Sequence, residues 1–517
     1  MSDSPASNSV GGVSDGESRS VGGVSDGDAL GARRRIADGG ASYKVDVVAD
    51  GGASYKVAVI GGGLAGLAAA VALADERVGV ELFEATARLG GRAGSFADPV
   101  SGDLIDHCQH VSMGCCTNLA DFCRRVNIAD CFRRDRVLHF IGPDGRHFPL
   151  AASRWLPAPL HLAPALWKLG YLSLGEKIGI GRAMGRLMRM SSAAESETTV
   201  GQWLRDQRQS QRAIDRFWSV VLVSALSETV DRASLAAARK VFVDGFLASR
   251  RGYEIEVPTV ALGEMYGRRM IDALAARGVA VHLSTSVTSL EGDERAVQEV
   301  CFADDTRQHY DAVIVAVPWR RVGALLASSL AGALRQLHSL DQIESAPITA
   351  VHLWFDRPIT MLPHAVLIDR LSQWVFNHGV QDTDPPEHYY QVVVSASRDL
   401  AGRDRDEIAA EVHDELASVW PAAGAARLLR HRIVTQPHAV FSVSVGVDRL
   451  RPSQTTPIPN LFLAGDWTAT GWPATMESAV RSGYLAAQGA LASLGRHVSL
   501  LQPDLPRGTL ARLLVRK

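Results

Sequence analysis

The sequence predicts an α/β fold in which a Rossmann-like, dinucleotide-binding domain is interleaved with an α+β domain. Two observations lead to this prediction. Near the start, residues 57–74 read as a buried strand, a glycine-rich turn and an Ala/Leu-rich helix, which is how a dinucleotide-binding unit begins. Near the other end, residues 460–466 read as a second buried strand that ends in Gly-Asp. Strands so far apart in sequence leave room for another domain between them.

The glycine-rich turn has the G-x-G-x-x-G spacing at Gly61, Gly63 and Gly66, between a strand at 57–60 and a helix at 64–74. In such a turn the first glycine allows a tight bend, and the second lets the backbone approach a pyrophosphate. The third lets helix and strand pack closely. A lone glycine pattern is a weak signal, but its place between a strand and a helix predicts a dinucleotide site.

Two further features of this unit predict contacts to the nucleotide. The N–H groups at the helix start, including those of Leu64 and Ala65, are free to bind phosphate, and the helix dipole strengthens that interaction. A second strand at 78–83 ends at Glu84, 18 residues after Gly66. A carboxylate at that place accepts hydrogen bonds from the ribose hydroxyls of a dinucleotide.

A second glycine-rich loop and the C-terminal strand favour FAD over NAD. Gly91 and Arg92 belong to a Gly-Gly-Arg-Ala-Gly-Ser run that follows Glu84, where N–H groups and one cation can reach the same pyrophosphate. The C-terminal strand ends in Gly465 and Asp466. Two nucleotide-compatible strand ends near opposite ends of the chain indicate one long cofactor. Because no cysteine lies in this C-terminal region, we expect the FAD to be non-covalent.

Together these motifs resemble the superfamily of FAD-dependent amine oxidases and carotenoid desaturases. Within it, the chain is similar to the squalene-associated FAD-dependent desaturases, which include the hydroxysqualene dehydroxylases of hopanoid biosynthesis. This similarity covers residues 56–495 and departs from the family pattern at Ser227, where the family tends to have Asn. The segments that carry it are residues 106–114 (DHCQHVSMG), 217–218 (FW), 464–468 (AGDWT), 471–475 (GWPAT) and 477–483 (ESAVRSG).

The resemblance implies a two-dinucleotide-binding-type FAD domain and the reduction of hydroxysqualene to squalene. It implies as partners an isoprenoid lipid substrate, an external electron donor and neighbouring enzymes of the squalene pathway. It also implies that Val287 contacts the adenine side of FAD through its backbone. We expect Asp466 to hydrogen-bond ribityl or phosphate oxygens. The N–H groups of Thr475 and Met476, at a predicted helix start, are expected to hold the pyrimidine oxygen of the flavin.

Three polar residues in an otherwise apolar segment, Asp106, Gln109 and His110, are the candidate catalytic residues. Replacing an allylic hydroxyl by hydride needs an acid or polarising donor for the leaving oxygen, and a dry pocket for a cation-like centre. In an alternative role, Gln109 and His110 only satisfy buried backbone groups around the flavin. The cysteines and histidines of this region lack zinc-ligand spacing, so we expect no metal.

The order of predicted elements divides the chain between the two domains. Residues 1–55 carry short Gly/Ser/Asp-rich repeats and are expected to be a disordered tail, because such a composition buries little apolar surface. The expected segments after it are FAD-binding at 56–148, 265–340 and 441–495, substrate-binding at 149–264 and 341–440, and a C-terminal tail at 496–517.

Charge and hydrophobicity suggest where the protein acts. The net charge of −2 argues against nucleic-acid binding, because such proteins are usually basic. Residues 145–175 contain no acid, and prolines interrupt their apolar residues, so they do not match a spanning helix of about 20 apolar residues. Arg182, Arg186 and Arg189 then lie opposite an apolar helix face, a pattern of lipid interfaces that ordinary surface helices share. We expect a cytoplasmic protein in peripheral contact with the inner face of the membrane.

Three functions stay open at this point. The first is reduction of hydroxysqualene. The second is oxidative desaturation of a carotenoid-like polyene, because the residues do not state the direction of electron flow. Amine oxidation is a weaker variant of it, because an amine would need an aromatic cage and the sequence shows no clear one. The third is a non-catalytic prenyl-lipid binding or escort protein, and the intact glycine, Glu84 and Asp466 set argues against it.

Overall fold

The computed structural model describes residues 55–99, 101–190 and 197–516. The predicted disordered tail at 1–55 therefore lies outside the described residues, apart from Tyr55. All described residues belong to one compact unit, Tyr43–Lys517. The boundaries drawn between an FAD-binding and a substrate-binding domain stay a prediction.

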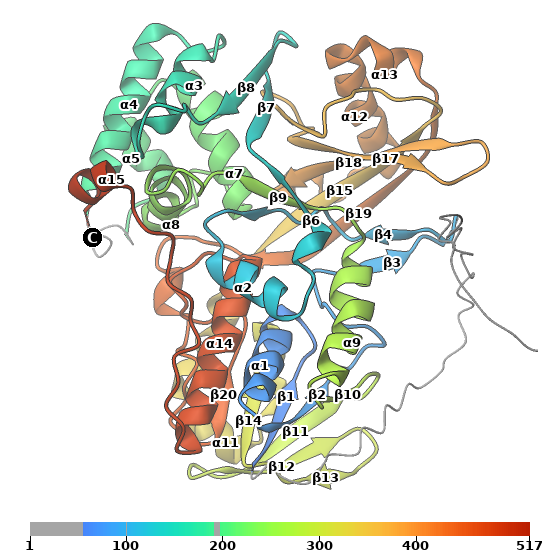
Figure 1. Cartoon of the computed structure of the whole chain (residues 1–517), viewed down its shortest axis with the longest axis vertical. Coiled ribbons are helices and arrows are strands. Elements are labelled where there is room, and N and C mark those ends of the chain that lie inside the picture. Colours follow the sequence, from blue (N-terminus) through green and yellow to red (C-terminus); the bar gives the residue numbers. More distant parts are fainter. Residues whose placement is uncertain (1–54, 100, 191–196, 517) are drawn as a thin grey trace, which may run out of the picture. The chain divides into compact units, whose positions relative to one another are not determined.

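Five parallel strands form the sheet expected for nucleotide binding (Figure 1). Across the sheet their order is β10 (Ala280–His282), β2 (Gly79–Phe83), β1 (Lys56–Ile60), β14 (Ala312–Val315) and β20 (Leu461–Leu463). The strand nearest the C-terminus thus lies two places from the first strand of the fold. This parallel sheet confirms the predicted α/β fold class.

Both faces of the parallel sheet are covered, which explains why its strands are almost wholly apolar. Val57 and Val59 pack toward three helices, and Ala58 and Ile60 face the opposite layer. The helical layer holds α1 (Leu64–Asp75), α9 (Arg269–Ala275) and α14 (Met476–Ser493), with α2 (Thr117–Arg125) against α14. The opposite layer holds the antiparallel strands β11 (Val287–Gly292), β12 (Val297–Phe302) and β13 (Arg307–Gln308), with helices α10 (Trp319–Leu325) and α11 (Ser328–Ala333).

A second, seven-stranded sheet lies above the first in Figure 1. Its order is β19 (Leu428–Phe441), β15 (Ser345–Phe355), β18 (Glu387–Ser395), β17 (Trp374–Gln381), β16 (His364–Leu367), β7 (Val137–Ile141) and β8 (His147–Ala151). One face packs on α12 (Arg405–Val419) and α13 (Pro421–Ala425). Strand β7 lies within residues 56–148, yet it pairs with β16 of this sheet.

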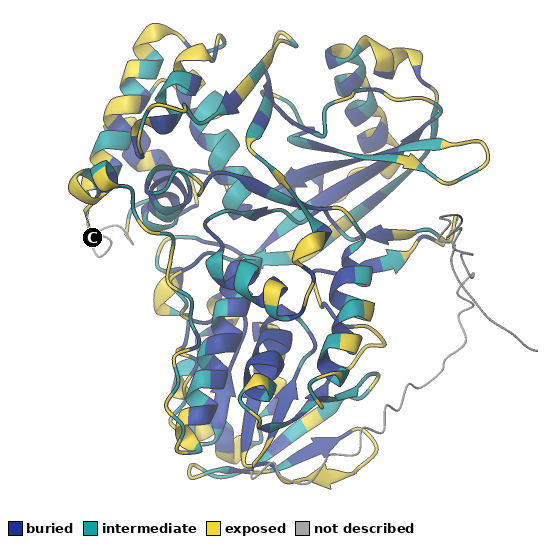
Figure 2. Ribbon diagram, viewed as in Figure 1, coloured by how far each residue is buried: buried dark blue, intermediate teal, exposed yellow. Residues whose placement is uncertain are grey.

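Short strands and helices connect the two sheets and cover the second one. The short strands are β3 (Ser95–Ala97), β4 (Leu104–Asp106), β5 (Ser112–Met113), β6 (Phe132–Asp135) and β9 (Ile255–Pro258). The helices are α3 (Ala163–Lys168), α4 (Leu174–Arg189), α5 (Val200–Asp206), α6 (Gln211–Ala213), α7 (Val220–Leu226), α8 (Leu235–Arg239) and α15 (Thr509–Leu514). Figure 2 shows buried residues concentrated in the parallel sheet and α1, and exposed residues on outer helices such as α4.

Nine short segments of 3-10 or π-helix complete the described chain. They are η1 (Ala129–Cys131), η2 (Leu160–Leu162), η3 (Ile214–Ser219), η4 (Lys240–Leu247), η5 (Glu264–Arg268), η6 (Arg335–Leu337), η7 (Leu340–Gln342), η8 (Ser397–Leu400) and η9 (Val447–Arg449). Helix α9 continues directly from η5. None of the helices in the described ranges is both long and apolar enough to cross a bilayer.

The departure from the family pattern at Ser227 lies at the end of a helix. Ser227 ends α7 in the left-handed region, with a φ of +52°, which Asn adopts more readily than most other residues. The next residue, Glu228, is fully buried and binds both terminal nitrogens of Arg398, at 2.8 and 2.7 Å. This ion pair fastens the helical region to the second sheet, so the helix end keeps its place without Asn.

Helices α1 and α14 pack against each other unusually closely at Gly483. A Cβ atom added there would lie 2.2 Å from the carbonyl oxygen of Ala65 and 3.0 Å from the Cβ of Ala68. Only glycine therefore allows the C-terminal helix to pass this close to the first helix of the fold.

We expect Gly483→Ala to lower the free energy of unfolding by about 1–3 kcal/mol, because the two helices must separate to admit the methyl group. Equilibrium denaturation in urea measures the loss. Gly175→Ala on α4 is the matched control, because a Cβ there meets nothing within 4 Å. An equally small effect for both variants would contradict the close packing.

Candidate functional site

The first glycine turn closes tightly between β1 and α1. Gly61 has a φ of +113° and donates its N–H to the carbonyl oxygen of Phe83 at 2.8 Å. A Cβ on Gly66 would lie 1.9 Å from the carbonyl oxygen of Gly61, whereas a Cβ on Gly63 would meet nothing within 4 Å. Gly61 and Gly66 are therefore required by the turn itself, and Gly63 borders open space.

The start of α1 points its N–H groups into that space. Leu64 and Ala65 are buried through their side chains, and they occupy the first turn of α1, where N–H groups have no partner inside the helix. These groups, together with the open side of Gly63, form a place where an anion such as pyrophosphate binds.

Glu84 lies at the end of β2 beside the same turn. Its Oε2 accepts the N–H of Gly62 at 2.8 Å, and its Oε1 accepts both the N–H and the hydroxyl of Thr86, each at 2.8 Å. The carboxylate is half-buried and keeps unused lone pairs. The backbone thus orients it next to the glycine turn, as an acceptor for ribose hydroxyls requires.

The second glycine loop touches the first. The N–H of Gly90 donates to the carbonyl oxygen of Gly62 at 2.9 Å. Gly91 has a φ of +58°, and a Cβ there would lie 3.1 Å from the Cα of Gly63. The exposed Arg92 side chain then forms an ion pair with Asp466. Residues predicted to share one pyrophosphate therefore lie together.

A buried arginine holds the loop that carries Asp466. Nη2 of Arg451 donates to the carbonyl oxygens of Asp466 at 3.0 Å, Thr468 at 2.7 Å and Trp472 at 2.8 Å. Gly465, with a φ of +144°, donates its N–H to the hydroxyl of Ser482 at 2.8 Å. These bonds fix the backbone around Asp466, whose side chain is almost fully buried.

The start of β11 lies close to the Glu84 end of β2. Ser284 and Thr285 donate their N–H groups to the carbonyl oxygens of Thr86 and Glu84, both at 2.9 Å. Val287 follows two residues later, half-buried and opposite Phe302. Val287 thus lies on the same side of the site as Glu84, where its contact with the adenine side of FAD is predicted.

Thr475 and Met476 begin helix α14. The hydroxyl of Thr475 accepts the N–H of Ser478 at 3.1 Å and caps the helix. Both residues are half-exposed. The N–H groups of this first turn are left unused by the helix itself, as the predicted contact to a flavin oxygen requires.

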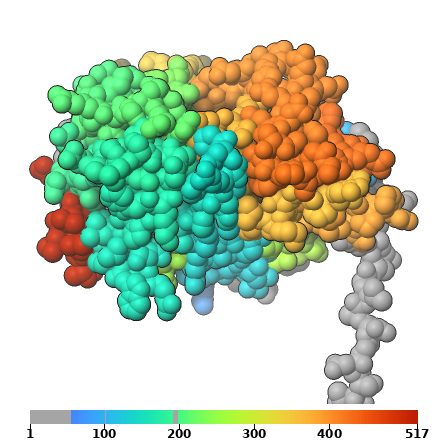
Figure 3. Space-filling view, turned by 90° about the horizontal axis from the view of Figure 1, so that it is seen from above, coloured from blue at the N-terminus to red at the C-terminus, as the bar shows by residue number. Residues whose placement is uncertain are grey.

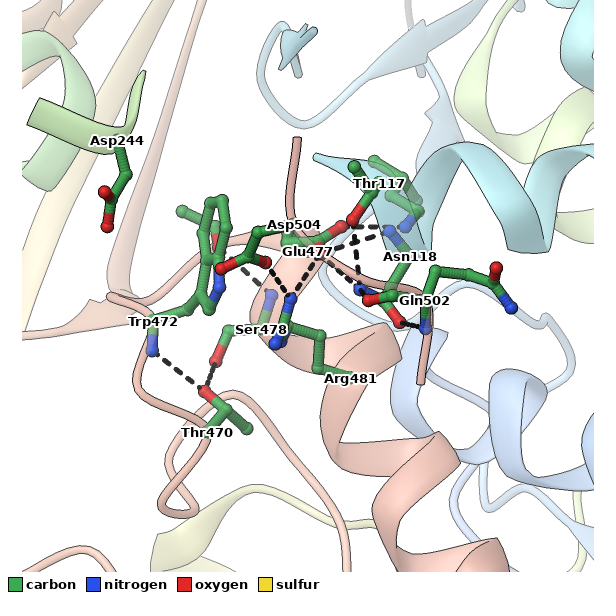
Figure 4. Close-up of polar contacts among 12 residues, drawn as sticks. Thr117, Asn118, Asp244, Thr470, Trp472, Glu477, Ser478, Arg481, Gln502 and Asp504 are labelled. Carbon is green, nitrogen blue, oxygen red and sulfur yellow. Dashed lines mark hydrogen bonds and ion pairs between the residues drawn. The ribbon is translucent and has the colours of Figure 1, made fainter. Parts of the chain in front are cut away.

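Glu477 joins the same helix to α2 (Figure 4). Its fully buried carboxylate accepts the N–H of Asn118 at 3.2 Å and that of Leu119 at 2.8 Å, and Nδ2 of Asn118 at 3.0 Å. Arg481 approaches it at 3.3 Å. Glu477 therefore caps the start of α2, and sequence reasoning had given it no role beyond the family pattern.

Asp106 connects three segments. Its Oδ1 accepts the hydroxyl of Ser95 at 2.6 Å and the N–H of Leu262 at 2.9 Å. Burial raises the pKa of Asp106 to about 6, against these two hydrogen bonds. The contacts give Asp106 a place in the framework next to the second glycine loop, and a catalytic role for it stays a prediction.

Gln109 and His110 carry the unused polar atoms of this segment. Nε2 of Gln109 donates to the carbonyl oxygen of His110 at 3.2 Å, while Oε1 is buried with no hydrogen-bond partner among the described residues. Burial lowers the pKa of His110, and nearby Arg92 lowers it further. Nδ1 of His110 lies 2.9 Å from the carbonyl oxygen of Cys108, so the neutral ring carries its proton there. Nε2 is then an acceptor.

The residues present fit FAD. Two glycine loops in contact, the free N–H groups of α1 and a ribose-side carboxylate serve one end of a dinucleotide. Arg92, Asp466 and the start of α14 follow on from them. Gly61, Gly63, Leu64, Ala65, Gly66, Glu84, Gly91, Arg92, Val287, Gly465, Asp466, Thr475 and Met476 would hold the cofactor, and their individual roles stay predictions.

A model of the family described as flavin containing amine oxidoreductase matches residues 64–491. The chain belongs to that family. FAD is its cofactor, and the protein is an FAD-dependent oxidoreductase of the amine oxidase superfamily. The resemblance drawn from the sequence motifs is confirmed.

The chain is similar to known proteins with different activities. A 15-cis-phytoene desaturase of Synechococcus elongatus is 28% identical over 453 residues, which are 83% of this chain and 94% of the relative. A hydroxysqualene dehydroxylase of Zymomonas mobilis is 27% identical over 436 residues, 83% of this chain and 97% of the relative. The solved structure of cyclohexylamine oxidase from Brevibacterium oxydans superimposes with a TM-score of 0.63 at 18% identity, covering 86% of this chain and 100% of that one. This structure is similar in fold.

We expect Gly63→Asp to abolish FAD retention, because the carboxylate would lie against the pyrophosphate. The open space around Gly63 means that the fold itself tolerates a side chain. The flavin absorbance of the purified protein and its circular dichroism are the two measurements. Gly63→Ala is the control, and a Gly63→Asp protein that remains yellow and active would refute this site.

Proposed function

We propose that this enzyme acts on an isoprenoid lipid and reduces hydroxysqualene to squalene with loss of water. Relatives named hydroxysqualene dehydroxylase, which align with the chain over most of their length, support this reaction. Hydride replaces the hydroxyl group on carbon, and one proton leaves with that hydroxyl as water. Two electrons therefore enter per turnover, from an external donor.

The observation that carries the proposal is the buried Oε1 of Gln109, which has no hydrogen-bond partner among the described residues. The same segment also offers the Nε2 of His110. Both atoms are hydrogen-bond acceptors. A substrate hydroxyl can donate to one of them, whereas a hydrocarbon polyene has no such donor. Sites that hydrogen-bond a substrate hydroxyl discriminate strongly against analogues without it, because their buried polar groups are then left unpaired.

FAD, when bound and reduced, supplies the hydride. The residues of the chain orient the substrate. Segment 106–110 is attached to the second glycine loop through the N–H of His107, which donates to the carbonyl oxygen of Gly94 at 3.1 Å. Gln109 and neutral His110 would hold the hydroxyl as acceptors, and the surrounding buried apolar side chains would exclude water from the reacting carbon.

An anaerobic half-reaction tests the proposed direction of electron flow. The protein is reduced with dithionite, hydroxysqualene is added in detergent, and flavin absorbance is followed together with mass spectrometry of the lipid. We expect the oxidised-flavin band to return as squalene appears. Unchanged reduced flavin would count against reduction and favour the desaturase function suggested by the phytoene desaturase relatives.

Variants at the two acceptors test the carrying observation. We expect Gln109→Leu and His110→Ala each to lower turnover by about tenfold or more, because the substrate hydroxyl loses a positioning partner. FAD should stay bound in both variants. His147→Ala, at an exposed histidine on β8, is the control. Wild-type rates in both acceptor variants would assign Gln109 and His110 to the framework around the flavin.

A further inference from the structure

One surface of the described chain gathers exposed apolar side chains. We call the surface formed by residues 154–189 the α3–α4 face. All ten tryptophans lie in the described ranges, and only Trp155 (88% exposed) and Trp167 (47%) are exposed. Both belong to this face, and Leu160, Leu174 and Ile178 are also exposed on it. Figure 3 shows this teal segment as a continuous surface.

A groove of about 560 Å³ runs along this face between α3 and α4. Its walls combine apolar and basic side chains, namely Leu166, Trp167, Lys177, Arg182, Arg186 and Arg189. No acidic residue is among those that line it. A groove of this composition fits a ligand with an anionic group and apolar chains.

The cations of the groove are not neutralised by described neighbours. Lys177 donates to the carbonyl oxygen of Trp167 at 2.8 Å, and Arg186 donates to the side-chain oxygen of Gln207, which is uncharged. For Arg182 and Arg189, no ion pair or hydrogen bond from the side chain is present within residues 55–99, 101–190 and 197–516. Within the described part of the chain, no acidic residue therefore neutralises the positive charge of the groove.

Glu176, the acidic residue of α4, is paired with an arginine that does not line the groove. Glu176 caps the helix through Ser173 and binds Arg212 with both carboxylate oxygens, at 2.9 and 2.8 Å. The Arg212 guanidinium lowers the pKa of Glu176 to about 2. This pairing anchors the start of α4 and leaves the groove with its basic character.

Two glycines keep the groove open. A Cβ on Gly181 or on Gly185 would meet nothing within 4 Å, so packing within the described chain does not require glycine at either place. Glycine inside a helix is less stable than alanine. The opposite side of α4 is an ordinary core face, on which Ile180 and Leu187 are fully buried.

We propose that the α3–α4 face docks on a bilayer that contains anionic phospholipids. The groove receives a lipid phosphate among its cations, and Trp155 and Trp167 enter the interface. Tryptophan favours the membrane–water boundary, basic amphipathic helices lie in it, and each lysine or arginine near an anionic surface adds to binding. This inference does not depend on which reaction the enzyme catalyses.

Vesicle flotation of the full FAD-loaded protein tests the charge requirement. We expect binding to phosphatidylcholine vesicles that contain phosphatidylglycerol, weak binding to pure phosphatidylcholine, and loss of binding as salt screens the charges. Arg182→Ala/Arg189→Ala should weaken partitioning about fivefold per arginine, the factor that corresponds to about 1 kcal/mol. Arg295→Ala/Arg335→Ala removes the same charge at exposed positions off the face and should change nothing.

Tryptophan quenching by brominated lipids tests the contact itself. Quenching should occur in phosphatidylglycerol vesicles and disappear in Trp155→Phe/Trp167→Phe, while Met361→Ala, an exposed apolar residue elsewhere (86%), keeps it. An intact flavin spectrum in each variant checks the fold. Absence of binding to anionic vesicles, or equal loss in the face and control variants, would overturn the proposal. Such a result would instead favour a soluble acidic protein as the partner of the groove.

Discussion

Close packing between the first and last long helices of the nucleotide domain is the constraint on which the site depends. Gly483 lets α14 lie against α1, and Glu477 on the same helix caps α2. Ser482, one residue before Gly483, holds the N–H of Gly465. One helix thus sets the position of the C-terminal strand end relative to the glycine turn. This attachment explains the family pattern at 477–483 without a catalytic role for its residues.

Two arginines complete the junction between the N-terminal and C-terminal parts of the site. Arg92, on the second glycine loop, forms an ion pair with Asp466. Arg451 donates hydrogen bonds to the carbonyl oxygens of the loop that carries Asp466. A guanidinium group suits this task, because it offers several donors in a fixed plane and stays charged when buried. Without Arg451, several buried carbonyl groups would lose their partner, at a cost of about 1–3 kcal/mol for each unsatisfied group. The geometry around Asp466 is therefore stabilised from two sides.

The parts of this architecture that follow local rules could be predicted from the sequence. The turn at Gly61–Gly66, the strand end at Glu84 and the C-terminal strand have short-range patterns, and a parallel sheet brings their ends to one edge. Arg451 has no such pattern, because its three carbonyl acceptors lie in a loop whose path depends on the whole fold. The partner of strand β7 could not be predicted either. Its pairing with β16 brings together residues 140 and 366, and local periodicity carries no information about a partner so distant in the sequence. Glu477 was recognised as part of a motif, but its acceptor role depends on where α2 lies.

Under the proposed function, the polar atoms near the second glycine loop set a requirement for the substrate. Oε1 of Gln109 is buried without a partner in the described ranges, and the tautomer of His110 makes its Nε2 an acceptor as well. Neither atom can satisfy the other, since both lack a hydrogen to donate. A buried acceptor without a donor costs free energy, and a ligand that brings a hydroxyl recovers it. A hydrocarbon ligand in the proposed site would exclude water from these atoms and would offer them no hydrogen-bond donor. Within the proposed function, the same chemistry favours an orienting role for these residues, because a neutral imidazole whose pKa is lowered by burial is a poor acid at neutral pH. In the proposed function, the polarity of the ligand, more than its length or unsaturation, is therefore the property that this segment would distinguish.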